Sequence, residues 1–323
     1  MAIESNQSRS GQNNGAGDDR ALFEKKMQTD VLRFFQATCI AKELVTNKTI
    51  ENGKSAAFPV IGNATAAYHE VGVELDGTSI TASEREITID KVIESHVYIP
   101  DIDAAMVHYD ANSAYNESIG RALAKKYDQD LFRQIVKTAN IIDDASALAA
   151  GLLVFDADFY SPVTTFATAG DELIGSKVYA KMVEMIATWT ELDIVGEPVF
   201  VLTPKSYYAL LNNPSQTGMT WANDSASQSG KVPMVLGKVV KTSPHIPQAD
   251  DSANAAVNTK YRADFLKTVG VLVAKEAVGA LELMSVSVRT DYIPTRLADL
   301  TVGKMLVGFG TLNHTAAMVL KSA

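Results

Sequence analysis

Histidine, cysteine and carboxylate side chains are the groups in this sequence that could bind a metal or act as a nucleophile or base. The five histidines are spread along the whole chain: His69, His96, His108, His245 and His314. None has the close histidine or cysteine partner that a zinc site requires, so we interpret them as structural. Cys39 is the single cysteine and cannot form an internal disulfide, which favours a reducing compartment such as a cytoplasm. We interpret Cys39 as a small apolar residue.

The glycine-rich segments do not match phosphate-binding loops. Residues 11–17 (GQNNGAG) follow no predicted strand and lack the Lys-Ser/Thr pair of a phosphate loop. Gly308 and Gly310 have no βαβ unit after them, unlike a dinucleotide-binding motif. No Gly-x-Ser-x-Gly nucleophile elbow occurs, and the 38 Asp and Glu residues single out no catalytic pair. We therefore expect no catalytic, cofactor-binding or metal-binding residues, no cofactor, and a protein that is not an enzyme.

Composition and charge narrow the class of protein. The chain has 323 residues, 46% hydrophobic and 21% charged, which is typical of a folded protein of about two domains. Its net charge of −9 argues against strong electrostatic binding of nucleic acid. Residues 143–259 carry 13 acidic and 6 basic side chains, whereas residues 260–323 carry 5 acidic and 8 basic ones. This asymmetry indicates a solvated acidic surface or, alternatively, complementary charge that steers copies of the chain together.

The N-terminal segment is polar and lacks the apolar region of a signal peptide. The longest apolar run, Ala145–Phe155, is too short for a membrane helix. We expect a soluble protein whose first 20 residues are mobile or become ordered only on contact with a partner. Residues 30–44 then have apolar side chains at helical spacing, which predicts a short amphipathic helix.

Two unusually long elements are predicted next. In Arg85–Ile99, aliphatic side chains occupy alternate positions, which predicts a single strand. The alternating run from Ile87 to Ile99, about 13 residues at ~3.3 Å each, would be about 43 Å long. Apolar residues then recur every four positions from Ile119 to Ile135, which predicts a helix from Asp101 to about Ala139, about 58 Å long. Both lengths suit an elongated subunit with an arm that lies on another molecule better than a compact enzyme domain.

Shorter elements are predicted around these two. A helix after Gly170 places a core stripe on one side, made of Ile174, Val178, Met182, Met185, Trp189 and Leu192. Pro59 limits a strand at Ala56–Ile61 to a sheet edge or a bulge. Further strands are predicted at 198–202, 235–241, 269–274, 281–288, 305–309 and 316–320, with a helix at 205–211 and a break at 308–310.

Eight segments, taken in order, carry a family resemblance. They are Gly53–Gly62 with Ala66–Tyr68, Ile87–Asp90, Asp101–Asp110, Pro198–Tyr208, Val235–Pro247, and Ala277–Leu283 with Gly308–Gly310. Together they resemble the major capsid proteins of short-tailed, autographivirus-type double-stranded-DNA phages, which have the Hong-Kong-97-type capsid fold. The similarity covers roughly residues 50–135 and 170–320. Where that family often carries an Arg-Pro-Glu-Ala run after the last glycines, this chain reads Leu312-Asn-His-Thr-Ala316.

The resemblance implies an α+β fold of the Hong-Kong-97 type with four parts. They would be an N-terminal arm (1–48), an extended β-hairpin loop (49–99), a peripheral domain with a long spine helix (100–144 and 277–323) and an axial domain (145–276). The implied function is that of a structural major capsid protein. It would self-assemble as hexamers and pentamers into an icosahedral shell of T=7 geometry that encloses phage double-stranded DNA.

The resemblance also implies partners and a location. The partners would be further copies of the chain, a separate scaffolding protein, a portal at one vertex and DNA bound without sequence specificity, with no membrane. The location would be the virion capsid, assembled in the host bacterial cytoplasm. Two alternatives remain open: a non-viral nanocompartment shell protein of the same fold, which would package enzyme, and a soluble cytosolic α/β enzyme, which would be monomeric.

Overall fold

The structure of the 323-residue chain is a computed structural model. It describes residues 29–36, 38–61, 68–69, 72, 82–89, 91–100, 111–141, 163–192, 194, 196–211 and 234–323. The chain divides into two compact units. Unit 1 comprises Met1–Cys39, Lys91–Tyr127 and Met284–Val307, and unit 2 comprises Ile40–Asp90, Asp128–Leu283 and Gly308–Ala323. Within the described ranges, no helix is both long and apolar enough to cross a membrane.

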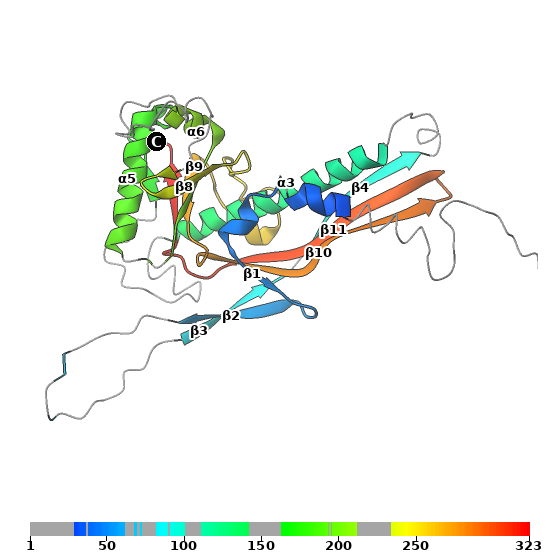
Figure 1. The fold of residues 1–323 in the computed structure, drawn as a ribbon, viewed down its shortest axis with the longest axis horizontal. Helices are drawn as coiled ribbons and strands as arrows, with labels where there is room; N and C mark the ends of the chain where they lie inside the picture. The colour runs from blue at the N-terminus through cyan, green and yellow to red at the C-terminus, as the bar shows by residue number, and fades with distance from the viewer. Residues whose placement is uncertain are drawn as a thin grey trace, which may run out of the picture. The chain divides into compact units, whose positions relative to one another are not determined.

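Long strands and the first part of a long helix build unit 1, and residues 128–139, 278–283 and 308–311 of the same elements belong to unit 2. Strand β4 (Val92–Pro100) pairs antiparallel with β11 (Ala298–Thr311), and β11 neighbours β10 (Val278–Ile293). Helix α3 (Ala111–Ala139) lies along this sheet (Figure 1). The helix approaches β11 so closely that a Cβ on Gly303 would lie 2.5 Å from Cγ2 of Ile119. One face of the sheet is therefore covered by the helix.

The apolar spacing predicted for α3 is confirmed. Its buried stripe consists of Ile119, Leu123, Tyr127, Leu131 and Ile135. The helix ends at Ala139, as predicted, and its 29 described residues span about 44 Å. Residues 101–110, where the predicted helix begins, lie outside the described residues. Pro100 is the last residue of strand β4.

The N-terminal amphipathic helix is also found, over residues 29–36 and 38. Its apolar face is buried at Val31 and Phe35, and the Phe35 ring packs edge-on against Tyr127 with centroids 5.8 Å apart. The chain then continues through the 3₁₀ helix η1 (Ala41–Leu44) to strand β1 (Thr46–Thr49), which pairs in parallel with residues 279–282 of β10. Cys39 is partly buried.

Unit 2 is centred on a six-stranded sheet of order β5-β12-β9-β6-β8-β7. The strands are β5 (Val163–Thr165), β12 (Ala317–Lys321), β9 (Thr268–Val273), β6 (Val199–Leu202), β8 (Lys238–Thr242) and β7 (Met234–Val235). Every residue of β9 is buried, as expected for a central strand that reads as a continuous apolar run. The remaining short elements are η2 (Asp171–Leu173) and η3 (Thr259–Tyr261).

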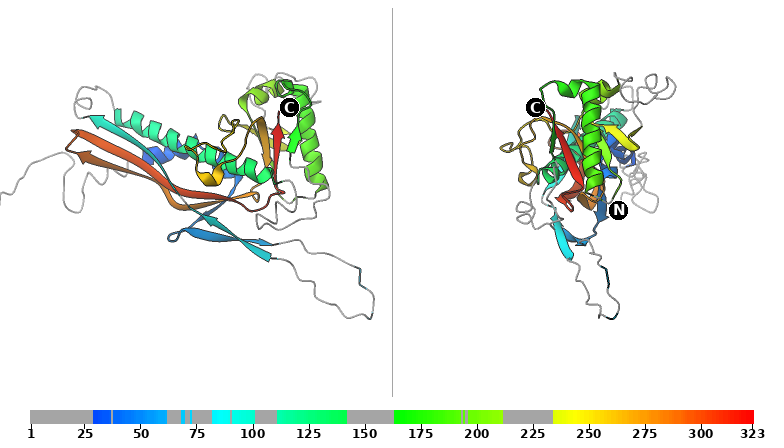
Figure 2. Two further views of the ribbon diagram at one scale, coloured as in Figure 1. Left: turned by 180° about the vertical axis from the view of Figure 1, so that it is seen from behind. Right: turned by 90° about the vertical axis from the view of Figure 1, so that its left-hand side faces the viewer.

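Two helices pack beside this sheet. Helix α5 (Gly175–Glu191) runs alongside the sheet (Figure 2) and buries Val178, Met182, Met185 and Trp189, four of the six residues predicted for its core stripe. Helix α6 (Pro204–Leu211) follows β6 directly. In its first turn the Tyr207 amide donates to the Thr203 carbonyl at 3.0 Å, and the helix begins at Pro204, one residue before the start predicted for it.

The prediction of one strand over Arg85–Ile99 is wrong. The segment forms two strands in different sheets: β3 (Ala82–Thr88), which pairs with β2 (Ser55–Ile61), and β4, which pairs with β11. Between them the Ile89 amide donates to the Lys54 carbonyl at 2.9 Å. The alternation itself holds, since Ile87, Ile89 and Ile99 are all buried. Alternation reports which side chains are buried and does not report whether the hydrogen-bond partner changes.

Two further predictions about breaks are corrected. Gly308–Gly310 does not interrupt the chain's extended structure, because β11 runs through both glycines to Thr311. Conversely, the strand predicted over Val235–Lys241 is a tight hairpin of β7 and β8. Its turn residues Leu236 and Gly237 have positive φ angles of 52° and 73°, the conformation that two-residue hairpins prefer.

Candidate assembly surfaces

The β2–β3 ladder is a two-stranded sheet, and both strands pair only with each other among the described strands. Its register runs from Ser55 opposite Thr88 to Ile61 opposite Ala82. Such open edges can pair with another chain. Pro59 lies in β2, in keeping with the edge position predicted for it. Tyr68, in the segment that joins the two strands, is fully exposed.

The ladder belongs to unit 2, and polar contacts hold its base against the rest of that unit. Lys260 Nζ donates to the Thr88 carbonyl at 2.8 Å, and Arg85 Nε donates to the Thr311 carbonyl at 3.3 Å. Partial burial lowers the pKa of the Arg85 guanidinium below its ordinary value. On the other strand, Lys48 Nζ donates to the Ala57 carbonyl at 2.7 Å and lies over the Phe58 ring.

A second exposed surface, which we call the tip cluster, lies at one end of β4, β10 and β11 in unit 1. It consists of Tyr98, Tyr292, Arg296 and Leu297, and the Arg296 guanidinium lies over the Tyr98 ring at 4.7 Å. Leu297 is 64% exposed and has a positive φ of 48°. A branched apolar side chain is unfavourable in that backbone region. Tyrosine and arginine are enriched in the energetic centres of protein interfaces.

A third surface is the β7–β8 hairpin of unit 2. Met234 and Val239 lie directly opposite each other and are exposed, as is Leu236 at the turn. Leu173, Ile174 and Tyr208 are exposed on η2, just after it, and on α6. Unit 2 therefore presents apolar side chains to solvent on several short elements. Of these, Met234 and Val239 are neighbours across the ladder, and contiguous exposed apolar side chains are typical of surfaces that bind another protein.

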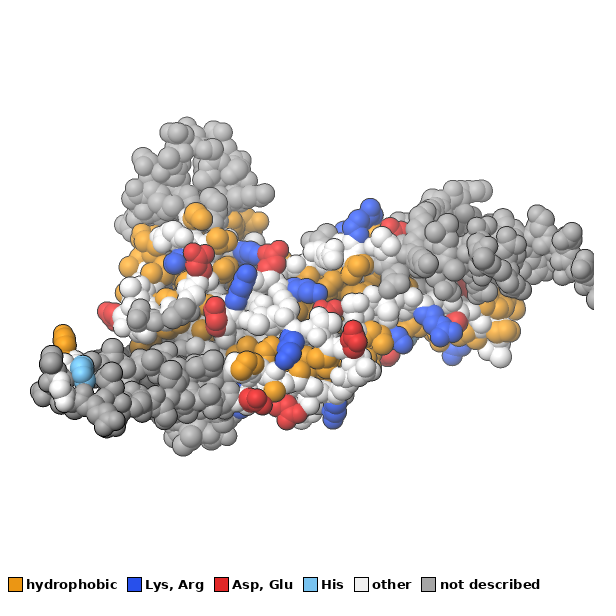
Figure 3. Space-filling model, turned by 60° about the horizontal axis from the view of Figure 1, so that its bottom comes forward, with side chains coloured by type: hydrophobic (Ala, Val, Ile, Leu, Met, Phe, Trp, Pro, Cys, Tyr) orange, Lys and Arg blue, Asp and Glu red, His pale blue; other side chains and the backbone are white. Residues whose placement is uncertain are grey.

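The face of the molecule drawn in Figure 3 carries both hydrophobic and charged side chains. Hydrophobic side chains there are interspersed with Lys and Arg and with Asp and Glu, and the two signs alternate over the surface. Independently of this view, Glu94 of β4 lies opposite Lys304 of β11 in the register. A mixed surface of this kind favours pairing with a matching protein surface over binding to a uniformly charged polymer.

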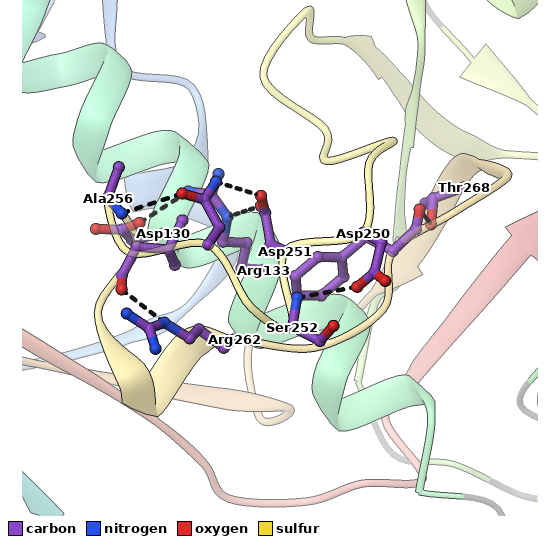
Figure 4. A network of polar contacts seen from close by, with 11 residues as sticks. Asp130, Arg133, Asp250, Asp251, Ser252, Ala256, Arg262 and Thr268 are labelled. Atoms are coloured by element: carbon purple, nitrogen blue, oxygen red, sulfur yellow. Dashed lines mark hydrogen bonds and ion pairs between the residues drawn. The ribbon is translucent and has the colours of Figure 1, made fainter.

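A buried ionic network orders the loop between β8 and η3 against α3 (Figure 4). Arg133 of α3 pairs with Asp130 at 2.9 Å and with Asp251 of the loop at 2.8 Å. Asn254 donates to Asp251 at 2.7 Å, and the Ala256 amide donates to Asn254 at 3.0 Å. The hydrogen bonds from Ser252 lower the pKa of the neighbouring Asp250 carboxyl. These contacts hold the loop between β8 and η3 in place against α3.

The residues that the sequence singled out for possible chemistry lie on different elements. His96 is exposed on β4, His69 is exposed, His245 is partly buried after β8, and His314 is buried between β11 and β12. His108 lies outside the described residues. Within the described part of the chain, no three His, Cys, Asp or Glu side chains are grouped so as to hold a metal ion.

The sequence did not single out the tip cluster or the Arg133 network. The leucine at the β10–β11 turn carries no signal, because turns of this kind usually contain Gly, Asn or Asp. Arg133 and Asp251 are 118 positions apart, so no local spacing pairs them.

The chain is similar to proteins of one known family. Residues 57–321 match the family model described as Gp10A-like: Major capsid protein. The chain is 28% identical to the major capsid protein of Escherichia phage T7, over 94% of this chain and 92% of that protein. It is 27% identical to the major capsid protein of Enterobacteria phage T3, over 95% and 93%. The capsid structure of cyanophage P-SCSP1u superposes with a TM-score of 0.72 at 26% identity, over 88% of both chains.

These matches confirm the predicted fold class, a mixed helix-and-sheet fold of the Hong-Kong-97 type. They favour neither of the two alternative functions considered from the sequence, a nanocompartment shell protein or a soluble enzyme. The chain is a component of the phage capsid, and proteins of this kind assemble with copies of themselves into shells. The match over residues 57–321 shows that this chain belongs to the Gp10A-like family of phage major capsid proteins.

Proposed function

We propose that the chain assembles as hexamers and pentamers into an icosahedral shell of T=7 geometry around phage double-stranded DNA. The observation that carries the proposal is the β2–β3 ladder, a two-stranded sheet with open edges and a fully exposed Tyr68 between its strands. A hairpin with open edges and little core of its own is stable only when it packs on something else. Obligate interfaces commonly bury more than ~2,000 Å², which an extended hairpin can supply.

The parts of the chain have distinct roles in this proposal. Residues 1–48 form an N-terminal arm, 49–99 the extended loop, 100–144 and 277–323 the peripheral domain with its spine helix, and 145–276 the axial domain. The 29-residue helix α3 and the long strands β10 and β11 support the assignment of the peripheral domain. The apolar β7–β8 hairpin supports contacts between axial domains. The chain's role is structural, with no catalytic step.

The net charge of −9 fits a container for DNA. A strongly basic inner wall would bind packaged phosphate tightly and in a salt-dependent manner. A net-negative wall lets the DNA slide in and out. The shell therefore encloses the DNA and does not recognise its sequence.

Assembly in this proposal takes place in the host bacterial cytoplasm and uses a separate scaffolding protein and a portal at one vertex.

The test is to express the chain in a bacterial host alone and together with the phage's scaffolding and portal proteins. Sedimentation and electron microscopy should show uniform icosahedral shells only in the second case. Hexamers and pentamers should be visible in a reconstruction of those shells. A monomeric mass under both conditions would contradict shell formation, and uniform closed shells from the chain alone would contradict the separate scaffold.

A further inference from the structure

Three glycines from two neighbouring strands surround the end of β3. Gly279 belongs to β10, and Gly308 and Gly310 belong to β11. Facing them, Ile87 is 1% exposed and Ile89 is 5% exposed. The β2–β3 sheet pairs with no other described strand, so its own ladder does not bury these side chains. We call Gly279, Gly308 and Gly310 the glycine seat.

The seat leaves no room for side chains of its own. A Cβ on Gly279 would lie 2.7 Å from Cδ1 of Ile87, and a Cβ on Gly310 would lie 2.8 Å from Cγ1 of Ile87. A Cβ on Gly308 would lie 2.5 Å from the carbonyl oxygen of Thr88. Ordinary contacts between carbon atoms are about 3.5–4.0 Å. The end of β3 therefore occupies the space that three side chains would fill.

The backbone conformation does not explain these glycines. Positive φ angles occur at Gly53, Gly72, Gly170, Gly196 and Gly237 among the described glycines, and at none of the seat glycines. An alanine could adopt the same backbone at each of the three positions. A glycine inside a strand weakens that strand unless another backbone approaches closely. The close approach of β3 therefore accounts for glycine at Gly308 and Gly310, and at Gly279 the side chain of Leu312 crowds the position together with Ile87.

Polar contacts hold β3 in the seat. The same Thr88 carbonyl that faces Gly308 accepts a hydrogen bond from Lys260 Nζ at 2.8 Å. One residue later, the Ile89 amide donates to the Lys54 carbonyl at 2.9 Å. Steric fit and hydrogen bonding thus act on the same two residues at the base of the hairpin.

We propose that Gly279, Gly308 and Gly310 are positioning residues for shell assembly, which hold the β2–β3 hairpin in one orientation before any neighbouring subunit binds. The inference rests on the proposed function, in which residues 49–99 contact a neighbouring subunit. A hairpin that is already oriented loses less conformational entropy when it docks. A loosened hairpin has to be ordered again at every intersubunit contact, so closed shells become rarer.

Gly308→Ala and Gly310→Ala in the full chain test the proposal. Hydrogen exchange of the unassembled subunit measures how firmly the hairpin is held, and sedimentation after expression with the scaffold measures shell yield. We expect exchange in residues 82–89 to rise about ten-fold, as when a stabilising contact of ordinary size is lost, and shell yield to fall with it. Ile87→Ala should rescue Gly310→Ala, whose three nearest atoms all belong to the Ile87 side chain. It should not rescue Gly308→Ala, whose nearest atom is a backbone oxygen.

Gly303→Ala is the matched control. It is the same substitution in the same strand and is also crowded, but its neighbours are Ile119 and Leu123 of α3. We expect it to lower stability without raising exchange in residues 82–89 above that of the remaining strands. Lys260→Met provides a variant without steric strain, and it should raise exchange at the hairpin base in a folded subunit and reduce shell yield.

The outcomes separate the inference from the proposed function. If the unaltered chain forms no shells with its scaffold, the proposed function fails whatever the variants do. If the unaltered chain forms shells and both Gly308→Ala and Gly310→Ala keep its exchange protection, the glycine seat does not hold the hairpin. If the variants loosen the hairpin but give normal shell yields, or lower the yield with unchanged exchange, the positioning role is overturned.

Discussion

Arg133 of α3 forms an ion pair with Asp251 of the loop before η3, with 2.8 Å between Nε and Oδ2. The two side chains are only 12% and 8% exposed. Arg133 also contacts the buried Asp130 at 2.9 Å. One guanidinium thus serves two carboxylates that have little access to water. The pairing fastens a long loop of unit 2 to its helix.

Replacing Arg133 with Met should strongly destabilise the unassembled subunit. The substitution keeps much of the side-chain volume but removes the cation that both carboxylates contact. Breaking a buried ion pair in this way costs about 3–5 kcal/mol, measured as the free energy of unfolding in urea. The control is Arg289→Met, because Arg289 and Asp291 form a pair that is largely exposed and should contribute less than ~1 kcal/mol. Equal effects of the two substitutions would contradict a structural role for the network.

Gly120→Ala should release the N-terminal helical segment from α3. A Cβ on Gly120 would lie 2.8 Å from the Val31 carbonyl oxygen and 3.1 Å from Cβ of Phe34. At an exposed helical position the same change would stabilise by about 1 kcal/mol, so a loss of stability marks the close contact. Trypsin should cleave after Arg33 faster in the variant. Ala122→Gly, at an exposed position of the same helix, should lower stability and leave the cleavage after Arg33 unchanged. Unchanged cleavage in Gly120→Ala would show that residues 29–36 do not depend on this contact.

Leu297→Asn should have opposite effects on the subunit and on the shell. Asparagine tolerates a positive φ better than leucine, so the unassembled subunit should gain up to about 1 kcal/mol. The same change removes the apolar side chain that the tip cluster presents, so shell yield should fall. Lys267→Asn is the control, since Lys267 also has a positive φ, of 64°, but carries a charged side chain. It should stabilise the subunit and leave shell yield unchanged. A normal yield from Leu297→Asn would exclude the tip cluster from assembly contacts.

Asp128→Ala should destabilise the start of the 3₁₀ helix η1. The Asp128 carboxylate is fully buried and accepts hydrogen bonds from the amides of Ile40 and Ala41, each at 3.2 Å. Without it, these amides lose their acceptor, at a cost of about 1–3 kcal/mol in the free energy of unfolding. Asp128→Asn keeps one acceptor oxygen and should lose less. If Asp128→Asn and Asp128→Ala had the same free energy of unfolding in urea as the unaltered chain, these hydrogen bonds would not contribute to stability.

The helices were the part of the fold that sequence predicted best. In α3 and α5, apolar residues recur at helical spacing, and the side chains from Ile119 to Ile135 are buried as expected. A helix makes its hydrogen bonds within one segment, so local spacing contains most of the information about it. The family resemblance was equally readable, since it depends on the order of short segments along the chain.

The strands were predicted less well, and the errors have one cause. Alternation at Ile87, Ile89 and Ile99 was read as one strand, yet Thr88 ends the ladder with β2 and Val92 begins the ladder with β11. A strand finds its partner far away in sequence, and burial of alternate side chains is compatible with any partner. For the same reason the hairpin turn at Leu236 was missed.

The sequence by itself determined the amphipathic helices, the burial of alternate isoleucines, the lack of any recognisable catalytic motif and membership of a capsid family. Only the tertiary structure decided what Gly308 and Gly310 do. In the sequence they indicate a break, whereas in the fold they lie within β11 and make room for Ile87 and Thr88. The physical reason is that a glycine's local conformational freedom can be read from the chain, while the space above its Cα depends on a segment more than 200 residues away.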